Sequence, residues 1–289
     1  MDFKNPGFTL ALFIILIIGS YVELTFGGSG YLSIIFFIIS LILLARLLNH
    51  RGTSQTLLKP TKKLTILGSV IIIADVLYNF RTSSDIQTLD TMLIFLGISF
   101  IAFSLKNNSF SNIGEFGIYF SSIFLLFFSA VYVLPSRLDL KIYDYYGFYA
   151  TTLPSLFILQ SMGISLKMDS LTTFHVYGIE DIFYKIDLGC FGFYSILLII
   201  STVLAYRLTQ PAKNNHSLAK IVILLVIASY LANLLRIIAL VSIGYYYGKD
   251  TMLLFHTFLG WALFAGIVLP IAYFFLRTTS EPDGTIEKI

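Results

Sequence analysis

The chain has 289 residues, of which 57% are hydrophobic and only 12% are charged, and its mean hydropathy is +0.84. A soluble globular domain carries about 25% charged residues, so this composition excludes a soluble enzyme as well as a disordered protein. The net charge of +3 is too small for a nucleic-acid surface. A single cysteine excludes a disulfide framework and a multi-cysteine metal site. The composition predicts an integral membrane protein with no nucleic-acid partner. No metal or cofactor is implied by the sequence.

Nine apolar stretches follow one another along the chain. Most approach the roughly 20 residues that a helix needs to cross a bilayer. They are continuous and do not alternate as barrel strands do, so the fold class is predicted to be an all-α transmembrane helix bundle of about eight or nine helices. The first is interpreted as a retained membrane helix because no small-residue cleavage site follows it. The stretches are 8–25, 31–48, 64–80, 89–105, 116–134, 147–162, 190–208, 218–243 and 252–276.

Basic residues indicate which loops face the cytoplasm. They cluster between the second and third stretches, between the seventh and eighth, and after the last, and the positive-inside rule makes all three places cytoplasmic. An even number of crossings must then separate Lys63 from Arg207, although five stretches lie between them. The short 147–162 stretch, which contains Pro154, is predicted to be interfacial or re-entrant. This leaves eight spans with both termini inside; nine spans with one violated loop remain the alternative.

The segment from Gly163 to Gly189 differs from its surroundings. Polar and apolar residues alternate loosely, and Tyr177-Gly178-Ile179-Glu180-Asp181 has the composition of a turn. We expect a small hairpin-like cap on the extracytoplasmic membrane surface. The cap leads directly into Cys190.

The last three stretches carry a thiol, a guanidinium and an imidazole at similar depths. Measured from the basic residues at their cytoplasmic ends, Cys190 lies about 26 Å, Arg236 about 24 Å and His256 about 32 Å along a helix, at about 1.5 Å per residue. All three groups therefore reach the outer leaflet boundary. Short links between these helices predict that they are neighbours.

These side chains suit nucleophilic catalysis. A thiolate is the reactive form of cysteine, and a helix N-terminus or a nearby cation stabilises it. His256 can take the thiol proton and later protonate a leaving amine. Arg236 keeps its proton, so it is predicted to stabilise an oxyanion or to grip a carbonyl or carboxylate. Asn233, one turn before Arg236, is predicted to orient Arg236 or the substrate.

Each residue also has a structural interpretation. A lone membrane cysteine is more often a packing residue, an arginine near a helix end can snorkel to the interface, and a lone histidine is usually structural. His50, His175 and His216 are interpreted as structural. Helix-end or inter-helix hydrogen bonds are the expected roles of Glu23 and Asp75. The shared depth of the thiol, the guanidinium and the imidazole favours a functional site over these structural roles.

The pattern Cys190-x-Gly192, Asn233-x-x-Arg236 and His256-x-x-x-Gly260 on three successive membrane helices resembles the exosortase/archaeosortase family. The resemblance covers roughly 116–270. It implies a polytopic membrane cysteine protease and transpeptidase that cuts C-terminal sorting signals, with Cys190, Arg236 and His256 as the catalytic trio. Many bacterial members read Ala-Cys-Ser-Gly where this chain reads Gly189-Cys190-Phe191-Gly192.

The predicted organisation is an N-terminal set of transmembrane helices (1–115), a catalytic membrane core (116–277) and a cytoplasmic tail (278–289). The resemblance implies substrates that carry a C-terminal sorting signal, a multi-pass position in the cell membrane, an acceptor such as a membrane lipid, and an active site at the extracytoplasmic face. The alternative is a non-enzymatic transporter in which Arg236 binds an anion.

Overall fold

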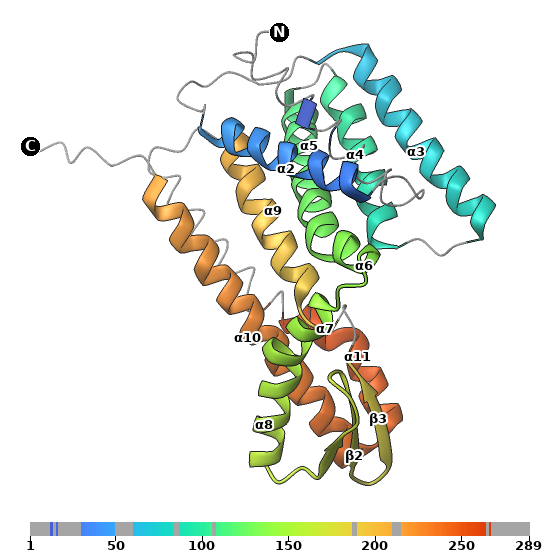
Figure 1. Cartoon of the computed structure of the whole chain (residues 1–289), viewed down its shortest axis with the longest axis vertical. Coiled ribbons are helices and arrows are strands. Elements are labelled where there is room, and N and C mark those ends of the chain that lie inside the picture. Colours follow the sequence, from blue (N-terminus) through green and yellow to red (C-terminus); the bar gives the residue numbers. More distant parts are fainter. Residues whose placement is uncertain are drawn as a thin grey trace, which may run out of the picture. The chain divides into compact units, whose positions relative to one another are not determined.

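The computed structural model describes residues 12–13, 16, 30–49, 60–83, 87–105, 108–186, 190–209, 215–263 and 266 (Figure 1). Packing divides the chain into two compact units. The first comprises Met1–Leu140 and Ile200–Lys213, and the second comprises Lys141–Ile199 and Asn214–Ile289. The sequence-based division at residues 115 and 116 is a different one and stays a prediction. Most of the first apolar stretch and the whole C-terminal tail lie outside the described residues.

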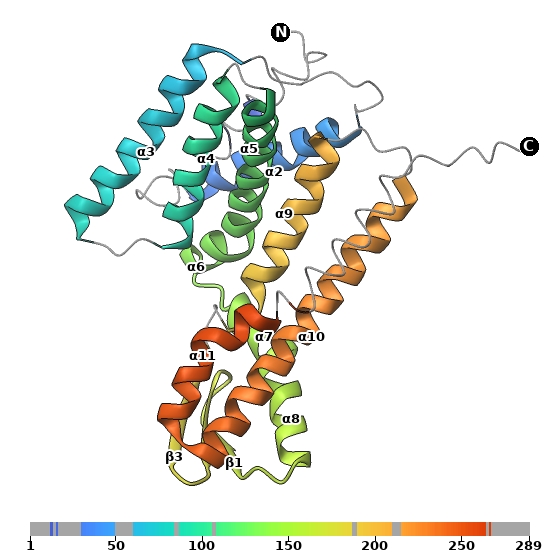
Figure 2. The ribbon, with the colours of Figure 1, turned by 180° about the vertical axis from the view of Figure 1, so that it is seen from behind.

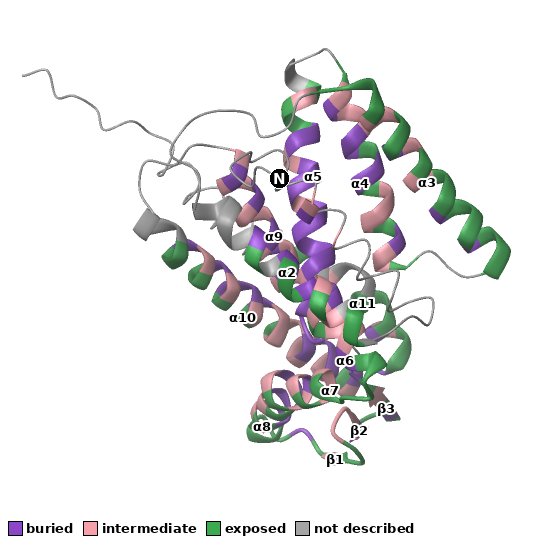
Figure 3. Cartoon of the chain, turned by 45° about the horizontal axis from the view of Figure 1, so that its top comes forward, coloured by how far each residue is buried: buried purple, intermediate pink, exposed green. Residues whose placement is uncertain are grey.

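The first unit is helical. Its elements are α2 (Gly30–Asn49), α3 (Lys62–Thr82), α4 (Thr88–Ser104), α5 (Asn108–Phe128), the π-helix η1 (Ser129–Val133), α6 (Leu134–Arg137) and the second part of α9 (Phe193–Thr209). α4 packs against both α3 and α5. Figure 3 shows α5 mostly buried and α3 mostly exposed. Large side chains such as Phe100, Phe103 and Tyr119 fill the core.

α3 and α4 approach each other through glycines. A methyl group on Gly68 would meet the carbonyl oxygen of Gly97, and a methyl group on Gly97 would meet the side chain of Ile72. Small residues that let two backbones approach closely are a common basis of helix association in membranes. This local packing is therefore typical of a membrane helix pair.

Three of the described helices are long and apolar enough to cross a membrane, namely Lys62–Thr82, Phe110–Arg137 and Ala219–Tyr247. α4 and α9 are shorter apolar helices. α3 exposes large apolar side chains along its length, among them Ile66 and Phe80, and an exposed apolar surface of this extent is suited to lipid. The predicted all-α membrane helix bundle is confirmed, and the number of crossings stays a prediction.

The second unit combines helices with a small sheet (Figure 2). Its elements are α7 (Ile142–Gly147), the π-helix η2 (Phe148–Thr152), α8 (Leu153–Ser161), β1 (Leu166–Met168), β2 (Thr173–Tyr177), β3 (Asp181–Lys185), the first part of α9, α10 (Asn215–Tyr247) and α11 (Lys249–Leu263). The 147–162 stretch thus forms a helical run. Whether it crosses the membrane stays a prediction.

The strands form an antiparallel sheet in the order β1-β2-β3. Phe174, Val176 and Ile182 lie on its buried face, where the ring of Phe174 stacks on that of Tyr184 with centroids 5.3 Å apart. Ile182 packs with Leu240 of α10 and Met252 of α11. The hairpin predicted around the Tyr177–Asp181 turn is confirmed, and β1 extends it to three strands. Its position on the membrane surface stays a prediction.

Candidate active site

A cavity of about 250 Å³ lies in the second unit. α10 and α11 each supply one wall from residues spaced three or four apart, which lie on one helix face. β3 and the residue after it supply a third wall. The lining residues are Phe174, Ile182, Phe183, Tyr184, Lys185, Ile186, Cys190, Arg236, Ile237, Leu240, Val241, Lys249, Met252, Leu253 and His256.

The structure brings Cys190, Arg236 and His256 to the wall of this one cavity. These are the three residues that the sequence places at a common depth on successive helices. Asn233, the fourth predicted residue, lies one turn before Arg236 on α10 and is not among the lining residues. Their roles in a reaction stay proposals.

Cys190 lies three residues before the start of α9 and is half-buried. Gly192 has a φ of +74°, which a residue with a side chain rarely adopts, and its carbonyl oxygen accepts the amide hydrogen of Ile196 at 3.2 Å. The turn at Gly192 therefore leads the cysteine segment directly into the N-terminus of α9. A helix N-terminus is a setting that favours a thiolate.

Asn233 holds the backbone of the cysteine segment. Its Nδ2 donates a hydrogen bond of 2.8 Å to the carbonyl oxygen of Cys190. A methyl group on Gly192 would lie 2.9 Å from Cγ of Asn233, so the glycine also makes room for this side chain. Asn233 thus fixes the backbone of Cys190, and its predicted role in orienting Arg236 or the substrate stays a prediction.

Phe191 anchors the same segment from the other side. Its ring is buried and lies against Gly147 at the end of α7, where an added methyl group would meet the ring. Its carbonyl oxygen accepts a hydrogen bond of 3.4 Å from Oγ1 of Thr151 in η2. Sequence reasoning missed Gly147 and Thr151, because nothing in a single sequence links residues about 40 positions apart.

Arg236 contributes a buried donor to the site. The side chain is half-buried, and its Nε has no hydrogen-bond partner in the part of the chain that the structure describes. Lys185 and Lys249 also line the cavity, whereas none of the lining residues given above is Asp or Glu. The described lining of the cavity therefore carries positive charge beside a thiol, which suits an anionic group. Sequence reasoning missed both lysines.

His256 occupies the cavity face of α11. Lys249, Met252, Leu253 and His256 follow the spacing of a single helix face, and all four line the cavity. The imidazole is exposed, so a substrate can reach it. The expected separation of about 4–5 Å between the thiol and the imidazole stays a prediction.

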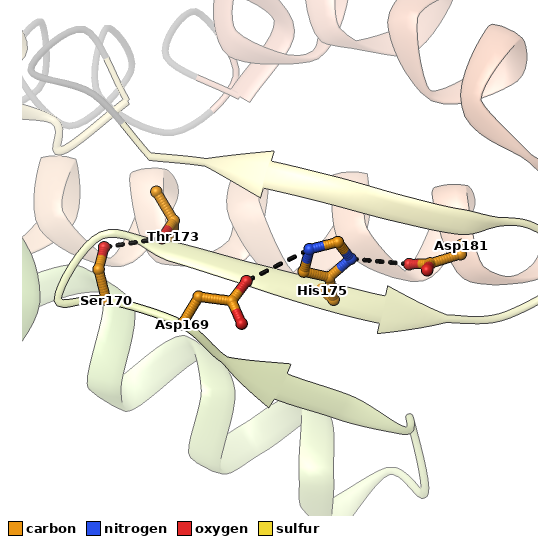
Figure 4. Close-up of polar contacts among 5 residues, drawn as sticks. All are labelled: Asp169, Ser170, Thr173, His175 and Asp181. Carbon is orange, nitrogen blue, oxygen red and sulfur yellow. Dashed lines mark hydrogen bonds and ion pairs between the residues drawn. The ribbon is translucent and has the colours of Figure 1, made fainter.

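His175 has the structural surroundings that the sequence predicts. Figure 4 shows its ring between two carboxylates of the sheet. Nδ1 lies 2.9 Å from Oδ1 of Asp181, and Nε2 lies 3.3 Å from Oδ2 of Asp169. These contacts join the residue that follows β1 to β3, and none of the three residues is among those given as lining the cavity.

The other polar candidates either have a hydrogen-bond partner in their own helix or lie outside the residues whose side chains the structure describes. Asp75 is buried in α3 and accepts a hydrogen bond of 3.5 Å from Nδ2 of Asn79, one turn away. Glu23 and His50 lie outside the described residues, and only the backbone of His216 is described. Among the described residues, no group of three or more His, Cys, Asp or Glu side chains could hold a metal ion.

Comparison with known proteins gives a match to a protein family. A family model described as "Transmembrane exosortase" matches residues 29–273, which is most of the chain. No curated protein and no solved structure matches it. The matched range includes α2 and every element of the second unit that lines the cavity.

Proposed function

Because the chain belongs to the transmembrane exosortase family, we propose that it is a membrane cysteine transpeptidase. It cleaves the C-terminal sorting signal of a membrane-delivered protein and transfers the remaining chain to an acceptor, such as the headgroup of a membrane lipid. One observation carries this proposal. A thiol, a guanidinium and an imidazole line one cavity of about 250 Å³.

In the first half of the reaction, Cys190 attacks the scissile carbonyl carbon. His256 takes the thiol proton, and the new carbon–sulfur bond pushes the carbonyl electron pair onto oxygen. Arg236 stabilises that oxyanion. His256 then gives its proton to the leaving amine as the carbon–nitrogen bond breaks, which leaves a thioester on Cys190 and releases the sorting signal.

In the second half, the amine of the acceptor attacks the thioester. Its proton passes to His256, the oxyanion forms again beside Arg236, and the carbon–sulfur bond breaks. The proton on His256 returns to the sulfur. The substrate is then joined to the acceptor, and the enzyme is restored without a metal or a cofactor.

Access through the membrane supports this assignment. Arg236 lies in the Ala219–Tyr247 helix, which is long and apolar enough to span a bilayer. A substrate helix can lie in the lipid and present its cleavage motif where that helix ends. We place the cavity at the extracytoplasmic face, because the basic loop between α9 and α10 lies at the opposite ends of both helices.

Hydroxylamine tests the proposal, because it attacks a thioester much faster than an amide. Membranes containing the enzyme and a substrate with a C-terminal sorting signal are treated with excess hydroxylamine, and the processed substrate is analysed by mass spectrometry. We expect a C-terminal hydroxamate on the upstream fragment and none with Cys190→Ala. Processing that yields no hydroxamate, and that Cys190→Ala leaves unchanged, would contradict the proposal.

The alternative is an anion transporter. The cationic wall of the cavity favours this reading, because Lys185, Arg236 and Lys249 can hold an anion without any chemistry. A transporter has no need for the thiol. Anion uptake that survives Cys190→Ser but fails in Arg236→Ala would support it.

A further inference from the structure

The joint between α10 and α11 decides where His256 lies. Gly248 is the one residue between the two helices, and it turns the chain with a φ of +85°. α10 carries Arg236 and is tied by Asn233 to the Cys190 backbone, whereas α11 carries His256. The angle at Gly248 therefore sets the position of the imidazole relative to the other two groups.

The tip of the β2–β3 hairpin (residues Gly178–Glu180) is hydrogen-bonded to both helices at this joint. The amide of Ile179 donates a hydrogen bond of 3.1 Å to the carbonyl oxygen of Tyr245 in the last turn of α10. Oε2 of Glu180 accepts a hydrogen bond of 3.1 Å from the amide of Lys249, the first residue of α11. Helix ends leave such carbonyl and amide groups without partners inside the helix. The hairpin tip supplies a partner to each helix.

The fit around these hydrogen bonds is close. A methyl group on Gly178 would meet the backbone of Tyr245, and one on Gly248 would lie 3.2 Å from Oε1 of Glu180. The carboxylate also lies at the positive end of the α11 dipole, which favours it there. The tip is thus packed against the joint as well as bonded to it.

We infer that Glu180 is a positioning residue for His256. Its hydrogen bond to Lys249 fixes the start of α11, and seven residues later the same helix presents His256 to the cavity that holds Cys190. The inference rests on the proposed function, because it assumes that the imidazole assists the thiol. It assigns the cap a role in catalysis that neither the family match nor the cavity lining states.

Alkylation of Cys190 by iodoacetamide tests the inference without any substrate, because Cys190 is the only cysteine of the chain. Rates are measured on the full chain in membranes at neutral pH. We expect His256→Ala to slow alkylation. Glu180→Ala is expected to slow alkylation by about tenfold. A misplacement of a reacting group by 1 Å can cost up to about 10²-fold in rate, so a tenfold loss corresponds to a smaller displacement of the imidazole. Glu180→Gln keeps an oxygen acceptor and is expected to restore most of the rate.

Asp250→Asn is the matched control, since it removes one negative charge from the first turn of α11 without touching the hairpin tip. It is expected to react like the unchanged chain. Gly178→Ala provides a second route, because its methyl group pushes the tip from Tyr245 while Glu180 remains. It is expected to slow alkylation as well. The thermal midpoint of each purified variant checks that it is folded.

The outcomes separate the two claims. If His256→Ala slows alkylation while Glu180→Ala and Gly178→Ala do not, the positioning role is wrong and the proposed function stands. If Asp250→Asn slows it as much as Glu180→Ala, charge and not the hydrogen bond is responsible, and the inference is again wrong. If His256→Ala leaves the rate unchanged, the imidazole does not assist the thiol, and both claims fail.

Discussion

Arg236 offers the cavity a planar fork of nitrogen donors. Its Nε is buried without a hydrogen-bond partner among the described residues, and no described residue that lines the cavity is an Asp or Glu that could hold the guanidinium. A buried donor without a partner loses its hydration and gains nothing in return. Under the proposed function, an oxyanion that forms during the reaction would supply the missing partner.

Arg236→Lys is therefore expected to impair processing although it keeps the charge. Lysine concentrates its donors at one ammonium group and places no nitrogen at the position of Nε. Loss of one donor to an oxyanion costs on the order of 10²-fold in rate. The measurement is the rate at which a co-expressed substrate is processed, with enzyme amount checked by immunoblot. A rate equal to that of the unchanged chain would rule out an oxyanion role for the guanidinium.

At the level of single residues, part of the candidate site could be predicted from the sequence. Counting residues from the basic loops placed Cys190, Arg236 and His256 at one depth, because a helix has a constant rise. The contacts that aim the thiol were not predictable. Thr151 and Gly147 reach Phe191 only through the packing of α7 and η2, and this packing has no local signal.

Among the elements, β3 and α10 meet at Gly244, where there is no room for an added methyl group unless a side chain shifts. A methyl group on Gly244 would meet the hydroxyl oxygen of Tyr184, whose hydroxyl is buried without a partner among the described residues. Gly244→Ala is expected to lower the free energy of unfolding by about 1–3 kcal/mol, which is the usual cost of overpacking. Addition of Tyr184→Phe is expected to recover part of that loss, because it removes the atom that the methyl group meets.

Thermal unfolding of the four proteins in this double-mutant cycle gives the coupling between the two positions. Tyr184→Phe alone is expected to be neutral or stabilising, since it removes a buried hydroxyl that lacks a partner. Strictly additive effects of the two changes would show that the Gly244 and Tyr184 positions do not touch.

Tyr184 also makes the stability of the folded protein depend on pH in the alkaline range. Burial raises the pKa of Tyr184 from 10.0 to about 12. Because the pKa in the folded state is higher than in the unfolded chain, the neutral phenol favours folding below pH 10, and this contribution is lost as the pH rises through about 12. We expect the thermal midpoint to fall less steeply over that pH range in Tyr184→Phe. Equal slopes for the two proteins would contradict the assignment.

Turn chemistry made the cap partly predictable. The Tyr177–Asp181 segment indicates a hairpin because glycine and polar residues interrupt an alternating pattern. β1 has only three residues and a weak pattern, so its pairing with β2 was not predictable. The anchoring of the hairpin tip to the α10–α11 joint was also not predictable, because its hydrogen bonds join residues more than 60 positions apart and each uses a backbone group that any residue type provides.

For the whole molecule, the proposed orientation places Cys190 outside the cell. The motive is the separation of Cys190 from the basic loop after α9, which is cytoplasmic by the positive-inside rule. A membrane-impermeant maleimide is expected to label intact cells that carry the chain, and a Cys190→Ala variant is the blank. Labelling only after the membrane is opened would reverse the orientation.

The helical membrane character of the chain could be predicted from hydropathy alone, because long apolar runs in lipid must satisfy their backbone hydrogen bonds as helices. The number of membrane crossings could not be predicted in this way. The 147–162 stretch forms η2 and α8 within a helical run, and its length and composition fit both a short span and a re-entrant helix. Charge counting constrains only whether the number of crossings is odd or even.

The central claim is that Cys190 performs the chemistry of sorting-signal removal. Its most direct test is the processing of a co-expressed substrate by Cys190→Ala, with the variant shown by immunoblot to be present in the membrane in normal amount. The substrate is expected to stay entirely unprocessed, because no other cysteine exists in the chain to form the thioester. Processing at the normal rate by this variant would contradict the account.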